Sequence, residues 1–148
     1  MNHIYKGKPF PLGSSLTSKG VNFSLVATNA EYVEILLFES EDSVSPETIF
    51  QLGHNNNTGP YWHAEISNLK EGCIYAFRVK QKNNGINNNY EKKVLLDPCS
   101  RGITGWGSYI RENALKSHEN TNSCLKSVVC NRKLFNFKDF PRPKHSWE

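Results

Sequence analysis

The chain has 148 residues, of which 37% are hydrophobic and 22% are charged, and its formal net charge is +4 at pH 7. This length predicts one domain that can bury a core without disulfides or metal ions. The sequence has no run that approaches the roughly 18 apolar residues of a membrane helix, and residues 1–10 lack the long apolar run of a secretory signal. We therefore expect a cytoplasmic protein without a membrane partner.

Charge is distributed unevenly between the two halves of the chain. Residues 1–72 carry 4 basic and 8 acidic side chains, whereas residues 73–148 carry 14 basic and 6 acidic ones. A basic region can indicate a nucleic-acid-binding surface, but these basic residues are scattered and form no long run. We therefore favour a solvated face, or a face turned towards another domain, over a nucleic-acid partner. A nucleic-acid binder would lose its affinity for DNA steeply with added salt.

The stretch over 20–39, GVNFSLVATNAEYVEILLFE, predicts the centre of the fold. Val21, Phe23 and Leu25 alternate with polar residues, which is the period of a half-buried strand whose polar side chains face solvent. A second strand is predicted from about residue 32 to residue 38, and a shorter one over 48–52. Residues 2–19 are rich in Pro and Gly and are predicted to be an irregular lead-in.

Alternation returns over 61–66 and 73–81, which predicts two further strands. In the first of these, Trp62 lies on the apolar side and His63 on the side expected to face the surface or an interface. A short strand is predicted over 94–96, and residues 128–129 can add one more extended piece. About six short strands separated by turns predict an all-β sandwich.

Four cysteines occur, at Cys73, Cys99, Cys124 and Cys130, and none forms a C-x-x-C pair. In a cytosolic protein this arrangement predicts reduced, mostly buried thiols. A zinc site of Cys124, Cys130 and His118 would have a spacing that matches no standard zinc pattern. We therefore expect no metal ion and no other cofactor.

The sequence also predicts no catalytic residue. It contains neither a G-x-S-x-G motif nor a phosphate-binding loop. Asp97 is the most distinctive acidic residue, but because Pro98 follows it we expect it to cap a turn.

Several short motifs occur in order along nearly the whole chain: PLG at 11–13, GVNFS at 20–24, AEYVE at 30–34, WH at 62–63, FRV at 77–79, LLDP at 95–98 and KSVV at 126–129. Their order and spacing resemble the opening of isoamylase-type glycogen and starch debranching enzymes of the α-amylase superfamily. The resemblance implies an immunoglobulin-like β-sandwich over 1–100, grouped with the family 48 carbohydrate-binding modules. It also implies an irregular connector over 101–148 that leads to a catalytic barrel outside this chain.

This resemblance carries a functional expectation. The parent enzyme would hydrolyse α-1,6-glucosidic bonds with two carboxyl groups supplied by the barrel. The present chain would be the non-catalytic N-terminal domain, which packs on the barrel and contacts α-glucan (glycogen or starch) weakly at most. Two alternatives stay open: a free-standing α-glucan-binding module, and an unrelated immunoglobulin-like interaction domain.

Sugar binding would require exposed aromatic rings that stack on pyranose rings. The candidate platforms are Tyr90, Trp106 and Trp62, with Tyr61 beside them. The place of Trp62 on the apolar side of its strand fits a core residue as well. Glycogen-binding modules of the wider family carry a lysine in a Tyr-Lys-Phe strand, and this chain has Ala76 at the matching position. That difference argues against direct glucan binding by the isolated domain.

Overall fold

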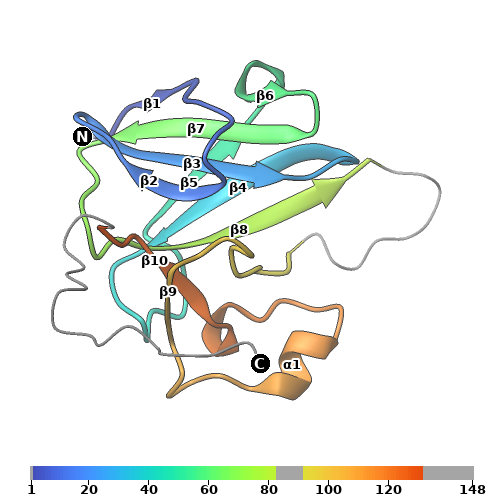
Figure 1. Ribbon diagram of the computed structural model, residues 1–148. Helices are drawn as coiled ribbons and strands as arrows, with labels where there is room; N and C mark the ends of the chain where they lie inside the picture. The colour runs from blue at the N-terminus through green and yellow to red at the C-terminus, as the bar shows by residue number, and fades with distance from the viewer. Residues whose placement is uncertain (1, 83–91, 132–148) are drawn as a thin grey trace, which may run out of the picture.

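The structure is a computed structural model that describes residues 2–82 and 92–131. Within these residues, strands form two antiparallel sheets that face each other as a sandwich (Figure 1). In order across the first sheet, the strands are β1 (Ile4–Tyr5), β7 (Tyr61–Ser67), β3 (Gly20–Val26) and β2 (Gly13–Leu16), and β6 (Asn57–Thr58) also pairs with β7. In order across the second, they are β5 (Thr48–Leu52), β4 (Ala30–Phe38), β8 (Ile74–Gln81), β10 (Lys126–Val128) and β9 (Gly102–Thr104).

The predicted all-β sandwich is therefore confirmed, together with its central strands. Among the residues that it describes, the structure adds one short α-helix, α1 (Arg111–Leu115), and two 3-10 turns, η1 (His54–Asn56) and η2 (Thr121–Ser123). The strand predicted over 94–96 is reduced to one bridge, in which Leu95 exchanges two backbone hydrogen bonds with Phe77. No helix in the described part of the chain is long and apolar enough to cross a membrane.

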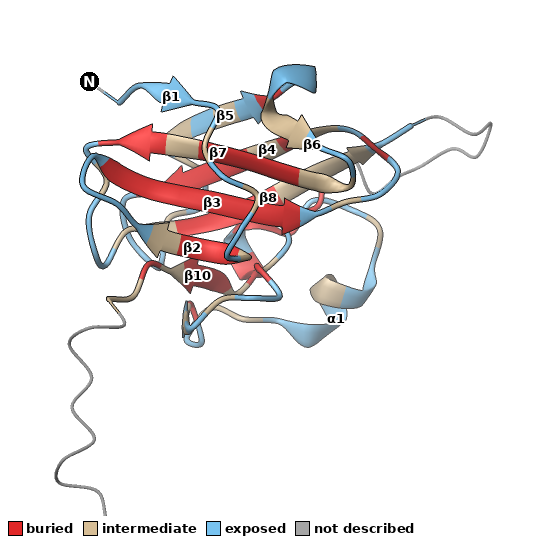
Figure 2. Ribbon diagram, turned by 45° about the horizontal axis from the view of Figure 1, so that its top comes forward, coloured by how far each residue is buried: buried red, intermediate tan, exposed pale blue. Residues whose placement is uncertain are grey.

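The main core lies between the two sheets and contains the side chains that alternate inwards along their strands. Phe23 of β3 and Tyr75 of β8 pack edge to face with ring centroids 4.8 Å apart, and Phe77 adds a second edge contact with Tyr75 at 5.8 Å. Each of these rings is at most 1% exposed. Trp62 is buried in the same core, on the side that its strand pattern predicts. Figure 2 shows β3 buried along almost its whole length.

The outer face of the first sheet differs from the expectation. The alternation along β3 predicts that its polar residues Asn22 and Ser24 face solvent, but both are buried, because residues 6–11 cross over this face. The side chain of Asn22 donates to the carbonyl of Lys8 and accepts from its amide, at 3.0 and 2.7 Å, and the hydroxyl of Ser24 donates to the carbonyl of Pro9 at 2.6 Å. The polar positions of β3 therefore bind the N-terminal segment instead of water.

His63 belongs to the same arrangement: of the two expected places, surface or interface, the surface is wrong, because the side chain is covered by the N-terminal segment. The imidazole is 1% exposed. Its Nδ1 lies 2.7 Å from the carbonyl of Lys6, and its Nε2 lies 2.9 Å from the hydroxyl of Thr58. The expected irregular lead-in over 2–19 is also wrong in part, because β1 and β2 lie in it and pair with β7 and β3.

A second cluster of apolar residues lies on the outer face of the second sheet. Leu36 and Phe38 of β4 and Ala76 of β8 are buried there beneath Val94 and Cys124. These covering residues belong to a segment that we call the outer layer, residues 92–125, which runs below β8 in Figure 1. The second sheet itself also extends beyond residue 100, because its last two strands are β10 and β9. The division of the chain into a domain over 1–100 and a connector over 101–148 stays a prediction.

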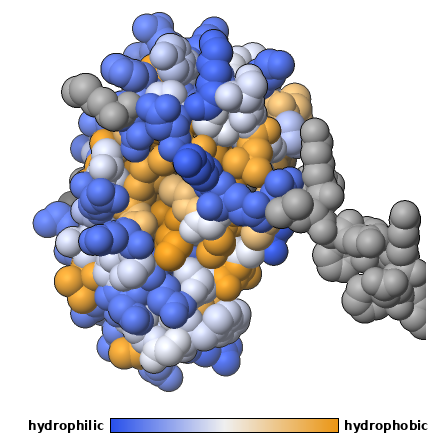
Figure 3. Space-filling view, turned by 90° about the vertical axis from the view of Figure 1, so that its left-hand side faces the viewer, coloured by the Kyte–Doolittle hydropathy of each residue, from blue (hydrophilic) through white to orange (hydrophobic). Residues whose placement is uncertain are grey.

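Apolar side chains also gather at the end of the sandwich where the β7–β8 turn lies, as Figure 3 shows. Leu69 and Cys73 in this turn are half-buried and pack against the main core. We interpret this apolar area as the open end of that core.

The packing of Phe23 yields a stability prediction. Phe23→Ala should lower the free energy of unfolding by about 3–5 kcal/mol, since it leaves a cavity between the sheets. Urea unfolding measured by circular dichroism would test this. Val44→Ala is the control, because Val44 is 71% exposed, and it should cost less than about 1 kcal/mol. A loss that small for Phe23→Ala would contradict the assignment of the core face.

Candidate functional site

Asp97 is the acidic residue that the structure buries most clearly, at 2% exposed. Its Oδ1 accepts the amide of Cys99 at 2.8 Å, as the predicted turn cap requires, and its Oδ2 accepts the hydroxyl of Tyr75 at 2.6 Å. Its own amide donates to the hydroxyl of Ser127 at 3.1 Å. Burial raises the pKa of Asp97, against the hydrogen bonds from Tyr75 and Cys99, which lower it. Asp97 therefore links the core to the outer layer and is a structural residue.

The candidate sugar platforms have very different exposures. Trp62 is 3% exposed and its indole N–H donates to the carbonyl of Ala27 at 3.0 Å, so its rings present no open face for a sugar. The alternative of a core residue is the one that this burial supports. Tyr61 is half-buried beside Phe10, at 4.8 Å between ring centroids. Tyr90 lies outside the described residues.

Trp106 is the exposed platform. Its side chain is 66% exposed, and its ring meets that of Tyr109 edge to face at 6.3 Å. Both residues belong to the outer layer, in the stretch between β9 and α1. Trp106 is therefore the predicted site residue with a ring face available to a partner.

The position of Ala76 decides whether the outer face of β8 is open to sugar. Ala76 is 0% exposed and lies in the cluster that Val94 and Cys124 cover. A lysine at this position in a glycogen-binding module needs an open face, whereas here the outer layer occupies that face. The sheet itself therefore offers no glucan surface at this point.

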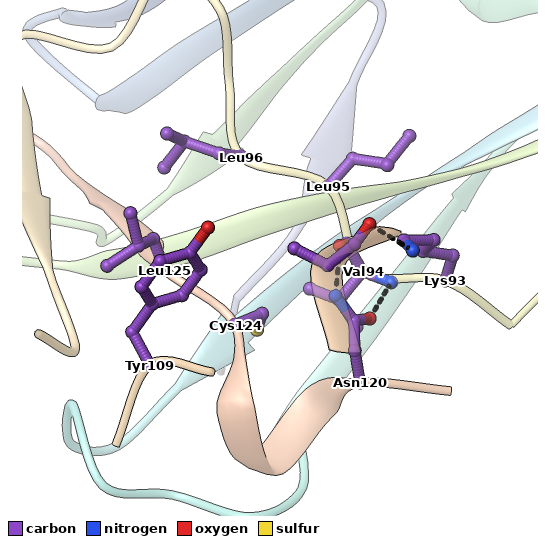
Figure 4. A pocket seen from close by; sticks show the side chains of 9 residues that line it. Lys93, Val94, Leu95, Leu96, Tyr109, Asn120, Cys124 and Leu125 are labelled. Carbon is purple, nitrogen blue, oxygen red and sulfur yellow. Dashed lines mark hydrogen bonds between the residues drawn. The ribbon is translucent and has the colours of Figure 1, made fainter. Parts of the chain in front are cut away.

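The outer layer contains a pocket of about 210 Å³, which we call the outer pocket (Figure 4). Its lining consists of Lys93, Val94, Leu95, Leu96, Tyr109, Ala114, Asn120, Cys124 and Leu125. Leu96 and Leu125 line one side of it together with the ring of Tyr109, as Figure 4 shows. Sequence reasoning missed this site: residues 94–96 are predicted as a strand, and no pattern connects them with the lining residues from 109 to 125.

Two of the polar side chains in the lining, those of Asn120 and Lys93, bind to the protein itself, and the lining also includes the hydroxyl of Tyr109. Asn120 accepts the amide of Val94 at 2.8 Å through Oδ1 and donates to the carbonyl of Val94 at 3.2 Å through Nδ2. The Nζ of Lys93, a buried residue, donates to the carbonyls of Asn113, Ala114 and Lys116. A cation at the carboxyl end of α1 stabilises that helix end. The wall that remains for a partner is therefore mainly apolar.

One exposed apolar side chain lines the outer pocket, and three more belong to residues that contact or directly follow its lining residues. We call them the apolar rim: Leu95 (40% exposed), Trp106 (66%), Ile110 (47%) and Leu115 (74%). Leu95 lines the pocket, Trp106 contacts Tyr109, and Ile110 and Leu115 directly follow the lining residues Tyr109 and Ala114. Several exposed apolar side chains in one segment are a candidate interaction surface.

The cysteine and histidine residues that were considered as zinc ligands do not form a metal site in the described part of the chain. Cys124 is buried, its thiol donates to the carbonyl of Thr121, and burial raises the pKa of that thiol, which keeps it protonated. His118 is exposed. Within residues 2–82 and 92–131, no three His, Cys, Asp or Glu side chains come together as metal ligands would. All four cysteines are free thiols.

The buried carboxyl of Asp97 predicts a pH dependence of stability. Its pKa is higher in the folded than in the unfolded chain, so its contribution is fully present below the ordinary aspartate pKa of about 4 and is lost as pH rises through the raised pKa. The difference in unfolding free energy between the parent chain and Asp97→Asn should therefore fall as pH rises through this window. Urea titrations at a series of pH values would measure it. Asp42→Asn, at an exposed position, is the control and should show no such trend. A difference that rises with pH would contradict the assignment.

Comparisons with known proteins agree with this geometry. Residues 11–100 match the family model of carbohydrate-binding module 48, described as the isoamylase N-terminal domain. The chain is 41% identical over 108 residues to the glycogen debranching enzyme of Erwinia tasmaniensis, and 35% identical over 109 residues to that of Pectobacterium carotovorum. These matches cover 71% and 72% of this chain and 16% of each enzyme. The chain thus spans about one sixth of the length of these curated relatives.

Solved structures show the same fold at lower identity. A pullulanase from Bacillus acidopullulyticus superposes with a TM-score of 0.55 at 20% identity, over 83% of this chain and 12% of that one. The catalytic module of the glycogen-degrading pneumococcal virulence factor SpuA superposes with a TM-score of 0.59 at 16% identity, over 86% of this chain and 17% of that one.

Proposed function

Since the chain belongs to the carbohydrate-binding module 48 (isoamylase N-terminal domain) family, we propose that it is the non-catalytic N-terminal module of a glycogen- or starch-debranching glycoside hydrolase. Its main task is to pack on the catalytic barrel of that enzyme. The barrel supplies both carboxyl groups for hydrolysis of the α-1,6-glucosidic bond. Membership of this family sets aside the alternative of an unrelated interaction domain.

The exposed apolar side chains of the outer layer are the observation that supports the packing role. The outer layer covers the sheet face over Ala76, and its own outward surface presents the apolar rim around the outer pocket. Fully burying a Leu or Ile side chain stabilises a complex by roughly 1.5–3 kcal/mol. The rim therefore suits an apolar protein surface better than a sugar, whose many hydroxyl groups need more polar partners than the mainly apolar pocket wall offers.

A second candidate function is weak α-glucan binding by a free-standing module. The exposed ring of Trp106 beside Tyr109 supports it, since aromatic faces stack on sugar rings. Under this alternative the ring of Trp106 would be the platform, and the outer pocket would hold part of the sugar. It predicts saturable binding of a linear maltooligosaccharide.

We also propose that the protein works in the cytoplasm. The four free thiols support this, because disulfides are rare in reducing compartments.

The packing role predicts association with a catalytic domain. The chain should bind the catalytic domain of the Erwinia tasmaniensis enzyme, prepared without the region that matches this chain. The double variant Ile110→Ser, Leu115→Ser should weaken that binding at least tenfold, or about 1.4 kcal/mol. Isothermal titration calorimetry would measure both affinities.

Val26→Ser is the matched control, because Val26 is an exposed apolar residue of the first sheet. It should leave the affinity unchanged. Absence of association, or an affinity lowered by Val26→Ser and not by the rim variant, would contradict the proposal.

A further inference from the structure

The segment between β4 and β5 reaches across to the stretch that carries Trp106. The carboxylate of Glu41 in this segment accepts the hydroxyl of Thr104 and, through the same Oε2, the amide of Gly105 at 3.3 Å. Thr104 is the last residue of β9, and Gly105 directly precedes Trp106. One side chain, 63 residues away from Thr104 in sequence, therefore binds the chain where it enters the Trp106 turn.

The backbone of Glu41 is fixed from the other side by a buried cation. Lys126 of β10 is 1% exposed, and its Nζ donates to the carbonyl of Glu41 at 2.7 Å. The same ammonium lies 5.1 Å from the ring centroid of Phe38. A buried ammonium is stable only with such partners, so the main chain of Glu41 is held in place and its carboxylate is presented to Gly105.

The turn beyond Gly105 has little freedom of its own. Gly105 has a φ of +90°, and a Cβ atom added to it would lie 3.2 Å from the carbonyl oxygen of Cys124. The amide of Ser108 donates back to the carbonyl of Gly105 at 3.3 Å. Whatever fixes Gly105 thus also restrains the backbone of Trp106, whose ring meets that of Tyr109.

We propose that Glu41 is a positioning residue, whose ionised carboxylate holds the turn over 104–109 and so keeps the indole of Trp106 at the rim of the outer pocket. This inference deepens the proposed function, since Trp106 belongs to the surface assigned to the partner. Its test needs neither the partner nor a sugar.

The charge of the carboxylate is central to this role. An ionised acceptor makes stronger hydrogen bonds than a neutral one. The bonds from Thr104 and Gly105 lower the pKa of Glu41, and the positive charge of Lys126 adds to them. Lys126 faces Glu41 from β10, and Glu39 and Asp42 flank it in its own segment. The charge-assisted hydrogen bonds from Thr104 and Gly105 to Glu41 are therefore present at neutral pH, and they weaken as pH falls through the lowered pKa of Glu41.

The experiment follows the indole N–H signal of Trp106 by NMR between pH 7 and pH 3, with the signal assigned by Trp106→Phe. The parent chain should show one step with its midpoint below the ordinary glutamate value of 4.5. Glu41→Gln should abolish the step, Glu41→Asp should retain a smaller one, and Asp42→Asn should leave it intact. The indole signal of Trp62, fixed in the core by its bond to Ala27, reports global unfolding.

A second measurement keeps the test decisive where acid unfolds the chain. At pH 7, Glu41→Gln should speed hydrogen exchange of the Gly105 amide at least tenfold, with that of the Phe77 amide unchanged. An unaltered Trp106 step or an unaltered Gly105 exchange rate in Glu41→Gln would overturn the inference. Failure of the proposed packing role alone would leave both signals as described, so the two results are distinguishable.

Discussion

The constraint on which the rest of the structure depends is the apolar outer face of the second sheet. Leu36, Phe38 and Ala76 lie on this face, while their strand neighbours fill the core between the sheets. Such a face has to be covered, because exposed apolar surface costs free energy in water. The outer layer covers it, with Val94 and Cys124 as the contacting residues. The extra strands β9 and β10 join that layer to the sheet on one side of β8.

This cover also decides what the module presents to a partner. The outer layer buries Ala76 on β8, where a sugar-binding surface would need solvent-exposed side chains. The surface that a partner can reach is therefore the outward face of the outer layer. Within the layer, Asn120 and Lys93 use their polar groups to bind its own backbone. Trp106 and Leu115 remain exposed beside the pocket. An apolar surface with internally bonded polar groups suits a protein interface, whose centre is depleted in charge.

The strands that could be predicted are those with one face in the core, because burial on one side imposes a period of two. The period of two does not tell which partner a polar position has. Asn22, Ser24 and His63 bind the N-terminal segment instead of water. Strands β1, β2 and β9 are too short to show a period. Trp106 could be found as an aromatic among glycines, whereas Leu115 belongs to a helix of five residues, too short for an amphipathic pattern.

The most direct test of this account is a titration of the isolated chain with maltoheptaose, followed by tryptophan fluorescence and backbone NMR shifts. If the covered sheet face and the apolar rim make the module a packing domain, millimolar sugar should produce no saturable change. Saturable shifts clustered at Trp106 and Tyr109 would contradict it, and would make the exposed Trp106 and the half-buried Tyr109 a glucan-binding site.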